Sequence, residues 1–384
     1  MIRFTREPVL SPARLQTLMI SVDDMRCIVE QVGLDTLMDE MIKRLFEAFQ
    51  SFDSTETIIP VRTGFSYDLP HVGLVEWMPL FQRHHQIIVK AVGYHPSNPN
   101  RYGLPTILST MSAYDTTSGH LAVVMDGTFL TALRTGAASA IASQLMATPD
   151  SEVLGLIGCG AQAVTQLHAL SRCFELERVL IFDVDPAIDQ SFSDRVACLQ
   201  LKHLKIQPVA VDDLVASADI ICTATSVEVG KGPVFSDRSL KPWVHVNALG
   251  ADFPGKFEIP LSLLQRSFVC TDFRDQAISE GECQQLADPS QIGAELFQVV
   301  QHPEQYLHRQ MTPTVFDSTG FALEDQVAMN MLLEYATDLQ VGTWINLESA
   351  SADERNPYSF VTDCKQKLPK LQQQSRELQG VIEF

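Results

Sequence analysis

Four charged side chains in the first half of the chain stand among apolar neighbours. Arg62, Glu76, Lys90 and Arg134 each lie in or beside an apolar stretch. Because burying an unpaired charge costs several kcal/mol, these residues are better explained if they converge on one site. Two arginines can hold a carboxylate through forked hydrogen bonds, a task that suits the planar guanidinium group. Taken singly, each of the four could equally serve in a structural ion pair.

A fifth candidate, Asp252, lies in the Gly/Pro-rich segment NALGADFPGK that follows a predicted strand. Parallel α/β sheets place ligand-binding groups at the carboxyl ends of their strands. A carboxylate there is suited to proton transfer, so Asp252 is a candidate acid/base. The alternative is that Asp252 caps a turn or a helix.

A glycine turn between an apolar run and a helical pattern gives a second kind of chemistry. The sequence VLGLIGCGAQA has the form G-x-G-x-x-A at Gly158, Gly160 and Ala163, which is typical of dinucleotide binding. Free N–H groups at the start of the helix that follows this turn would bind the diphosphate. Asp183 ends the next apolar run, where it would accept hydrogen bonds from ribose hydroxyls and repel a 2′-phosphate. This pattern favours NAD over NADP.

The elements that would position these residues follow from the alternation of apolar and polar residues. From Val153 onward short apolar runs alternate with helical patterns, which predicts a doubly wound parallel sheet with right-handed crossovers. Its predicted strands are Val153–Ile157, Val179–Asp183, Pro208–Val211, Ile220–Ala224, Trp243–Ala248, Phe268–Asp272 and Thr314–Asp317.

The first part of the chain has a different pattern. Asp24–Gln50 predicts one or two amphipathic helices, and a helix following Gly320 is expected to return and pack on this part. Between them we expect extended segments that carry Arg62, Glu76 and Lys90, and an Ala-rich helix with Arg134 in its first turn. The expected segments are Thr57–Phe65, His71–Pro79, Gln86–Tyr94, a hairpin of Pro105–Ala113 with His120–Met125, and the helix Thr131–Ala147.

Composition sets the broad class. A length of 384 residues with 45% hydrophobic and 20% charged residues indicates a globular protein of about two domains. The net charge of −19 argues against binding to nucleic acid or to an anionic membrane. No apolar run approaches the length of a membrane span, and the N-terminus has no leader pattern, so we expect a cytoplasmic protein. The eight cysteines show no metal-ligand spacing, which predicts reduced thiols and no metal site.

Five segments together resemble the ornithine cyclodeaminase/mu-crystallin family. They are MDGTFLTALRTGAASA (125–140), GCGAQA (158–163), TATS (223–226), NALGADFPGKFEI (247–259) and DSTGFALEDQVA (317–328). The resemblance implies an α/β protein in which a Rossmann-type doubly wound domain is inserted in an α+β substrate-binding and dimerisation domain, with the active site between them. We expect the first domain at residues 1–147, the NAD-binding domain at 148–320, and residues 321–384 completing the first.

The resemblance also implies roles for individual residues. Arg62, Lys90 and Arg134 match substrate carboxylate-binding positions, Lys90 is an active-site lysine, and Asp252 matches the catalytic aspartate. The expected cofactor-binding positions are Thr106, Arg134, Gly158, Gly160, Ala161, Gln162, Asp183, Thr225, Leu249, Gly250, Ala251, Asp252, Lys256 and Ser318. Where the ornithine enzymes resemble V-G-G-D, this chain has Leu249-Gly250-Ala251-Asp252, which adds a methyl group near the nicotinamide.

Members of this family carry out different reactions, and one segment of the chain helps to choose among them. VEWMP (75–79) looks like the ornithine-enzyme pattern in which a glutamate, here Glu76, faces the distal amine of the substrate. We therefore predict an NAD-dependent cyclodeaminase, acting on L-ornithine to give L-proline and ammonia, that works as a homodimer. One alternative is an imine reductase or amino-acid dehydrogenase on the same fold. The other is a non-catalytic, mu-crystallin-like binding protein, which the joint presence of Arg62, Lys90, Arg134 and Asp252 disfavours.

Overall fold

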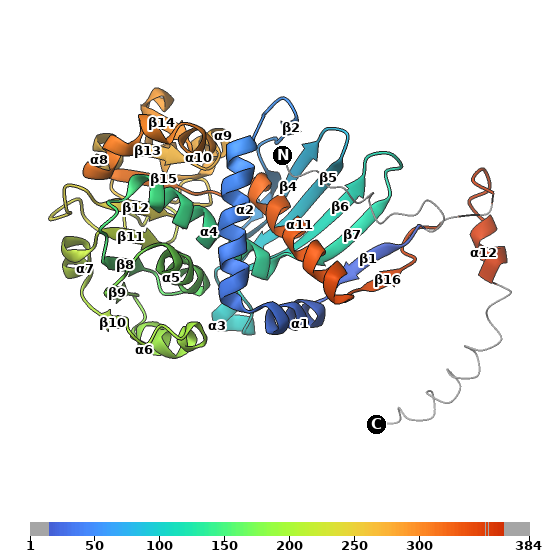
Figure 1. The fold of residues 1–384 in the computed structure, drawn as a ribbon, viewed down its shortest axis with the longest axis horizontal. Helices are drawn as coiled ribbons and strands as arrows, with labels where there is room; N and C mark the ends of the chain where they lie inside the picture. The colour runs from blue at the N-terminus through green and yellow to red at the C-terminus, as the bar shows by residue number, and fades with distance from the viewer. Residues whose placement is uncertain (1–14, 350, 352, 365–384) are drawn as a thin grey trace.

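Two sheets lie side by side in the computed structural model, which describes residues 15–349, 351 and 353–364. Sheet B is formed by the chain from residue 153 to residue 317, and sheet A by strands that precede and follow it. Helices α2, α4 and α11 lie between or across the two sheets (Figure 1). The expected insertion of a Rossmann-type domain in an α+β domain is confirmed.

Sheet B has eight strands in the order β10-β9-β8-β11-β12-β15-β13-β14, and every neighbouring pair is parallel. Chain order reverses between β8 and β11, so ligands are expected at the carboxyl ends of these two strands. The strands are β8 (Val153–Ile157), β9 (Arg178–Phe182), β10 (Lys205–Pro208), β11 (Ile220–Thr223), β12 (His245–Ala248), β13 (Phe268–Thr271), β14 (Ile292–Glu295) and β15 (Thr314–Asp317). Its helices are α5 (Ala161–Cys173), α6 (Pro186–Arg195), α7 (Val211–Ser217), α8 (Leu261–Arg266), α9 (Arg274–Glu280) and α10 (Leu296–Gln301).

The two outer strands of sheet B are where the sequence-based prediction was wrong. The strand predicted at Pro208–Val211 is β10 at Lys205–Pro208, and Val211 instead begins α7. An exposed edge strand needs no apolar run. The prediction therefore followed the apolar residues Val209-Ala210-Val211 and placed the strand too late in the chain. Strand β14 at the other edge, with only four residues, was not predicted.

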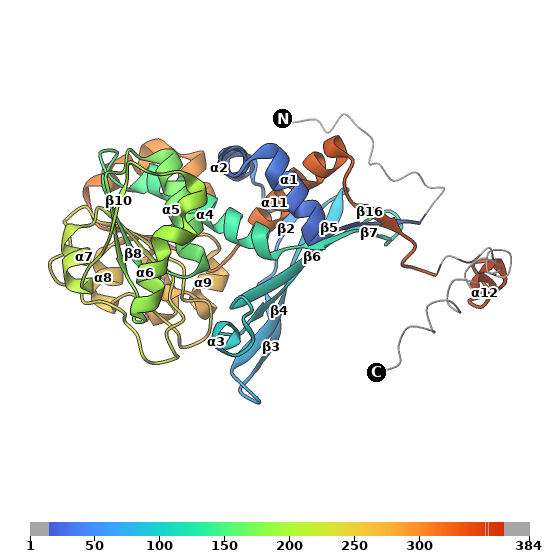
Figure 2. The same ribbon diagram turned by 90° about the horizontal axis from the view of Figure 1, so that it is seen from below.

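Sheet A has the order β16-β1-β7-β6-β5-β4-β2, with β3 paired to β4. Helices α1, α2, α4 and α11 cover one face, and the other face is largely bare (Figure 2). The strands are β1 (Thr17–Ile20), β2 (Thr57–Ile58), β3 (Thr63–Tyr67), β4 (Gly73–Gln82), β5 (Gln86–Tyr94), β6 (Ile107–Asp115), β7 (Leu121–Asp126) and β16 (Thr343–Ile345). The helices of this part are α1 (Val22–Val32), α2 (Leu34–Ser51), α3 (Asn98–Tyr102), α4 (Thr128–Met146), α11 (Ala322–Leu339) and α12 (Ser359–Cys364). Residues 1–14 and 365–384, the two ends of the predicted first domain, lie outside the described residues.

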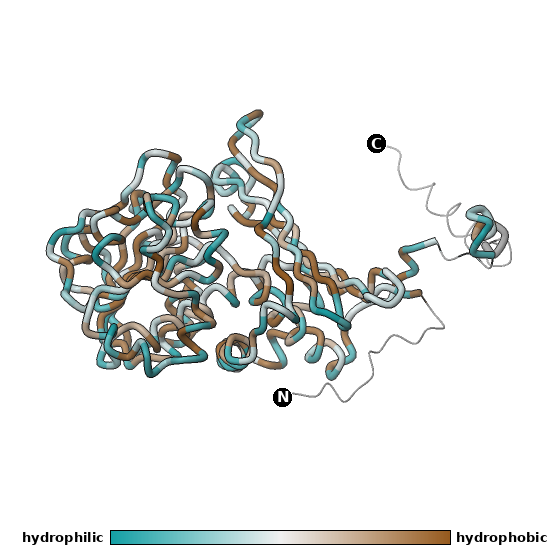
Figure 3. Tube along the Cα trace, turned by 90° about the horizontal axis from the view of Figure 1, so that it is seen from above, coloured by the Kyte–Doolittle hydropathy of each residue, from teal (hydrophilic) through white to brown (hydrophobic). Residues whose placement is uncertain are grey.

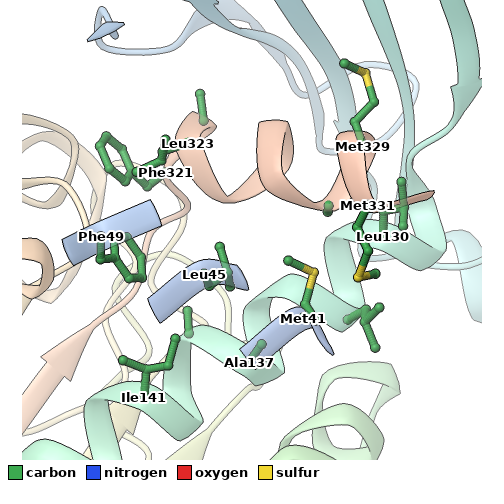
Figure 4. Close-up of a cluster of buried hydrophobic side chains, with 14 of the residues drawn as sticks. Met41, Leu45, Phe49, Leu130, Ala137, Ile141, Phe321, Leu323, Met329 and Met331 are labelled. Atoms are coloured by element: carbon green, nitrogen blue, oxygen red, sulfur yellow. The ribbon is translucent and has the colours of Figure 1, made fainter. Parts of the chain in front are cut away.

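Helix α4 is buried on almost every side, which explains its small side chains. It packs against α2, α5 and α11, and these helices share one hydrophobic cluster. In that cluster Met41, Leu45 and Phe49 of α2 face Leu130, Ala137 and Ile141 of α4, with Phe321, Leu323, Met329 and Met331 above them (Figure 4). The helix begins three residues before the predicted start, because Asp126 accepts hydrogen bonds from the N–H groups of Thr128 and Phe129. Arg134 therefore lies in its second turn, and the prediction of the first turn was wrong.

The described helices include none that is long and apolar enough to cross a bilayer.

Substitution of Gly136 tests the contact between α4 and α5. A Cβ at Gly136 would lie 2.6 Å from the backbone oxygen of Thr165. Although alanine favours a helix over glycine by about 1 kcal/mol, we expect Gly136→Ala to lower the free energy of unfolding by about 1–3 kcal/mol, because the backbones must separate. Denaturant unfolding measures this change. The control is Ser139→Ala, since the buried Ser139 hydroxyl has no hydrogen-bond partner among the described residues, and it should lose no stability. A Gly136→Ala protein as stable as its parent would contradict the close contact.

Candidate active site

The turn after β8 has the shape that a dinucleotide site requires. Gly158 has φ +87°, and a Cβ there would lie 2.7 Å from the backbone oxygen of Ala224, so the turn needs glycine. A Cβ at Gly160 would meet nothing within 4 Å. The protein itself therefore leaves open space at Gly160. Helix α5 begins at Ala161 without a side-chain cap, so its first N–H groups are free to bind a diphosphate.

Asp183 is fixed beside this turn. One carboxylate oxygen accepts a hydrogen bond from the N–H of Cys159 at 2.9 Å, and the other accepts from the N–H of Asp185 at 3.0 Å. Each oxygen keeps a lone pair for a ribose hydroxyl. The neighbouring thiol of Cys159 is buried, and burial raises its pKa, so it is a protonated, small side chain rather than a reactive thiolate.

A cavity with about 560 Å³ of empty space, open solvent at its mouth included, lies between the two sheets, and seven of the predicted site residues line it. They are Arg62, Lys90, Arg134, Gln162, Leu249, Asp252 and Ser318. The other lining residues are Met78, Val92, Ile107, Thr131, Thr135, Thr319 and Gly320. Gly158, Gly160, Ala161 and Asp183 belong to the dinucleotide turn described above. Glu76, Thr106, Thr225, Gly250, Ala251 and Lys256 are not among the lining residues.

Lys90 and Arg134 enter the cavity side by side and are held by two acids of α11. The Lys90 ammonium donates to Asp325 at 2.8 Å, and Arg134 donates to Glu324 at 2.6 Å. Arg134 Nε also lies 3.3 Å from Asp325. Burial lowers the pKa of Lys90 to about 8, and burial raises the pKa of Glu324 to about 8.

Arg62 comes from the loop between β2 and β3 and spans the two halves of the protein. Its Nε donates to Glu280 of α9 at 2.6 Å, and its terminal nitrogens donate to the backbone oxygens of Thr319 and Asp252 at 2.9 and 3.0 Å. Glu76 of β4 lies 3.1 Å from the same Nε. Burial, together with the charge of Glu280, raises the pKa of Glu76 to about 7 although Arg62 opposes the shift. Glu76 is thus ion-paired with Arg62, which lines the cavity, and does not line the cavity itself.

Asp252 is placed against an ammonium group. Lys256 donates to the Asp252 carboxylate at 2.9 Å and to the hydroxyl of Tyr94 at 3.2 Å. Lys256 is 2% exposed. Burial disfavours the charged form of Lys256, but the nearby acidic groups, Asp252 first among them, outweigh this effect. The pKa of Lys256 is therefore raised. The cavity therefore holds one carboxylate with a fixed, charged partner, which suits a group that gives and takes protons.

Several buried carboxylates that shape the site were missed by sequence reasoning. Asp272 accepts from the N–H of Gly320 at 2.6 Å and from the hydroxyl of Thr319 at 3.1 Å, and so fixes the loop after β15. Acidic residues at the start of a predicted helix, such as Glu324 and Asp325, are ordinary features of helix N-termini. Their only signal was their place in a segment that resembles the family.

Glu258, also missed, joins the loops after β11 and β12. Its carboxylate accepts from the N–H of Thr225 at 2.6 Å and from the N–H of Gly250 at 2.9 Å. Glu258 is fully buried, and a Cβ at Gly250 would lie 2.2 Å from its Oε1. Glycine at position 250 therefore makes room for this carboxylate, which holds two predicted cofactor-binding loops together.

Among the described residues, no group of three or more His, Cys, Asp or Glu side chains is arranged to hold a metal ion.

Fold and site together define a protein with a dinucleotide-type glycine turn after β8 and, between its two sheets, a cavity lined by three buried cations. The sequence model of the ornithine cyclodeaminase/mu-crystallin family matches residues 22–340. The chain belongs to this family.

Relatives with known activities share nearly the whole chain. It is 41% identical to L-lysine cyclodeaminase of Streptomyces rapamycinicus over 90% of this chain and 100% of that protein. It is 31% identical to ornithine cyclodeaminase of Agrobacterium tumefaciens over 91% of this chain and 95% of that protein. A solved lysine cyclodeaminase, studied for its recognition of L-lysine, L-ornithine and L-2,4-diaminobutyric acid, superimposes with a TM-score of 0.87 at 46% identity, covering 90% of this chain and 99% of the other. The Δ1-pyrroline-2-carboxylate reductase of Thermococcus litoralis, solved with NADH and L-proline, gives a TM-score of 0.77 at 27% identity, over 85% of this chain and 99% of that one.

The role of Glu258 can be tested through cofactor affinity. In Glu258→Gln one of the two backbone N–H groups would face an NH2 group, so the loops that carry Thr225 and Gly250 must shift. Losing a hydrogen bond to a charged group costs about 1.5–3 kcal/mol, so we expect NAD⁺ to bind about 10- to 100-fold more weakly. Titration calorimetry measures this affinity, with the exposed Glu228→Gln in the same region as the control. Equal NAD⁺ affinity in both variants would contradict the role of Glu258.

Proposed function

We propose that this chain is an NAD-dependent cyclodeaminase that converts L-lysine to L-pipecolate and ammonia, with L-ornithine as a shorter second substrate. The observation that carries this proposal is the cavity itself, which Arg62, Lys90 and Arg134 line together with Asp252. L-Lysine is preferred over the L-ornithine predicted from sequence because the identity to the lysine enzyme is 41%, against 31% for the ornithine enzyme over a similar length.

This chain is an enzyme whose cofactor is NAD. When bound, NAD⁺ accepts a hydride from the substrate Cα and later returns it, so the reaction has no net redox change. The residues present fit the cofactor, since the turn at Gly160 is open and Asp183 lies at the end of β9. Gly158, Gly160 and the start of α5 would hold the diphosphate, and Asp183 the adenosine ribose.

Three cations would orient the substrate. Arg62, Lys90 and Arg134 would bind the α-carboxylate, which fixes Cα within the cavity. Glu76 would attract the distal ammonium group of the substrate. With both ends held, the distal nitrogen attacks the α-imine carbon within the same molecule, which removes much of the entropic barrier to ring closure.

Asp252 would move the protons that ring closure requires. The distal ammonium would first give one proton to solvent, which frees its lone pair. The neutral nitrogen would then form its bond to Cα and lose a second proton, and the α-nitrogen would gain a proton before its bond to Cα breaks and ammonia leaves. A carboxylate beside Cα can accept the proton lost on bond formation and supply the one that the α-nitrogen gains. Lys256 holds this carboxylate in place through its hydrogen bond.

A second candidate function is net redox chemistry, as an imine reductase or amino-acid dehydrogenase. One observation favours it, because Glu76 is paired with Arg62 and does not line the cavity, so no predicted partner for a distal amine faces the open space. Relatives of both chemical kinds exist, including alanine dehydrogenase of Archaeoglobus fulgidus at 29% identity over 86% of this chain and 98% of that protein.

Simultaneous measurement of ammonia and of absorbance at the NADH wavelength separates the two functions. With L-lysine and catalytic NAD⁺ we expect continued ammonia release without accumulation of NADH. Asp252→Asn should lower kcat by about 10²–10⁴, the share that general acid/base groups contribute. The exposed Asp213→Asn is the control and should keep its activity. Accumulation of NADH, or activity only with an imine and NADH, would assign the redox function instead.

A homodimer is proposed through the bare face of sheet A. Trp77 and Leu108 on this face are 38% and 41% exposed, and Phe65, which packs edge-on against Trp77, is 73% exposed. Hydrophobic residues continue along the strands of this sheet (Figure 3). Exposed apolar patches of this kind mark protein–protein contacts. A related archaeal alanine dehydrogenase, with a TM-score of 0.75 at 28% identity over 87% of this chain and all of that one, is a dimer.

Introducing a charge on this face tests the proposed dimer. We expect Trp77→Glu to shift the molar mass measured by light scattering from that of a dimer to that of a monomer, since a buried unpaired carboxylate opposes association. Lys43→Glu on α2, away from this face, should leave the mass unchanged. A Trp77→Glu protein that remains dimeric would place the interface elsewhere.

A further inference from the structure

We propose that Asp325 is a positioning residue that holds the Lys90 ammonium and the Arg134 guanidinium together and keeps Lys90 charged for the substrate carboxylate. This inference rests on the proposed function, in which these two cations bind the α-carboxylate. Asp325 was assigned no role from sequence.

Asp325 lies where three elements from distant parts of the chain meet. It is the fourth residue of α11, Lys90 comes from β5, and Arg134 comes from α4. Asp325 is fully buried, and its two oxygens lie 2.8 and 2.7 Å from the Lys90 ammonium. The first oxygen also lies 3.3 Å from Arg134 Nε. One carboxylate thus sets the spacing of two cations.

The neighbouring acid has a different reach. Glu324 contacts Arg134 at 2.6 Å through the opposite nitrogen, and no contact between Glu324 and Lys90 is present in the described chain. Asp325 and Glu324 are equally buried, at 0% exposure. Glu324 therefore provides a matched control, because replacing it perturbs Arg134 and the same helical turn while it leaves the ion pair of Lys90 in place.

Asp325 acts through these cations and does not itself line the cavity. An ammonium group has three donors, and those that Asp325 does not use can turn toward the cavity, which Lys90 does line. Asp325 thus lies behind Lys90 and fixes the orientation of the ammonium group that reaches the cavity.

The charge of Lys90 needs this carboxylate. Burial lowers the pKa of Lys90 to about 8. Among the charged groups around it, Asp325 from α11 favours the protonated form, whereas Arg134 from α4 and Arg62 from the loop before β3 oppose it. Asp252 lines the same cavity. An opposite charge at this distance shifts a pKa by about 1–3 units. Without Asp325, Lys90 would lose its proton near or below neutral pH, and a neutral amine attracts a carboxylate only weakly.

The test measures carboxylate binding rather than turnover. Protein loaded with NADH cannot oxidise L-pipecolate or L-proline, so calorimetry gives the affinity of these carboxylates at each pH. In the unaltered protein we expect affinity to fall as pH rises through about 8, where Lys90 loses its proton. In Asp325→Asn the same fall should come about 1–3 pH units lower, with weaker binding at neutral pH.

Two further variants make the outcome decisive. Glu324→Gln should bind more weakly but keep the pH midpoint of the unaltered protein, whereas loss of the midpoint would mean that Glu324 is the titrating group and would overturn the proposal. Lys90→Arg, whose guanidinium stays charged, should abolish the alkaline fall. If it titrates like its parent, Lys90 is not the titrating group and the proposal fails, even if Asp325→Asn does not fold.

Failure of this proposal differs from failure of the proposed function. Carboxylate binding with the expected pH shifts but no ammonia release from L-lysine would refute the cyclodeaminase and support the role of Asp325. Ammonia release with an unshifted midpoint in Asp325→Asn would do the reverse. If the unaltered protein binds neither carboxylate, the cations do not form a carboxylate site and the role of Asp325 is refuted.

Discussion

The burial of positive charge between the two sheets is the constraint on which this structure depends. The side chains of Arg62, Lys90 and Arg134 are 7%, 1% and 6% exposed, and each is paired with a carboxylate. Removing such a partner would leave an isolated buried charge at a cost of several kcal/mol. The acids come from β4, α9 and α11, so these elements have to meet at the cavity. The insertion of the parallel sheet follows the same logic, because the acids of α11 lie in the segment that leaves sheet B and returns to sheet A.

Arg62 shows how charge pairing also ties the halves together. Its guanidinium reaches the backbone of the loops that carry Asp252 and Thr319, so a residue of the first part fixes the loops of the second. Helix α4 provides the rigid counterpart, since its small side chains let α2, α5 and α11 approach closely. The cations proposed to bind a carboxylate and the acid/base candidate are therefore built on one connected body, as a reaction that needs fixed distances requires.

The sequence predicted those features that are written locally. Apolar periodicity predicts the inner parallel strands, the glycine turn between strand and helix, and the helices α2, α4 and α11. The three cations could be singled out because charged residues are unusual in apolar stretches. Their partners could not be identified, because the partner of Lys90 is 235 residues away and an acid in a first helical turn is unremarkable. The edge strand β10 was misplaced for a related reason, since it is exposed and carries no apolar run. Strand β14 buries Ile292 and Ala294 but has only four residues, too few to give a clear pattern.

The choice between a cyclodeaminase and a redox enzyme depends on the surroundings of Arg62 rather than on the shared cations. Two carboxylates, Glu76 and Glu280, contact one guanidinium, so the cluster has an excess of negative charge unless a proton is held there. Burial is the main cause that raises the pKa of Glu76 to about 7, so Glu76 holds this proton up to about neutral pH. An ammonium group brought by a diamino acid can replace the proton as the compensating charge. A substrate with an uncharged side chain cannot replace the proton. For such a substrate the burial of these two acids costs free energy and contributes nothing to binding. The charge of the cluster therefore suits a substrate with a second amine, whereas its position behind the cavity wall, which Glu76 and Glu280 do not line, is the feature that favours the redox function.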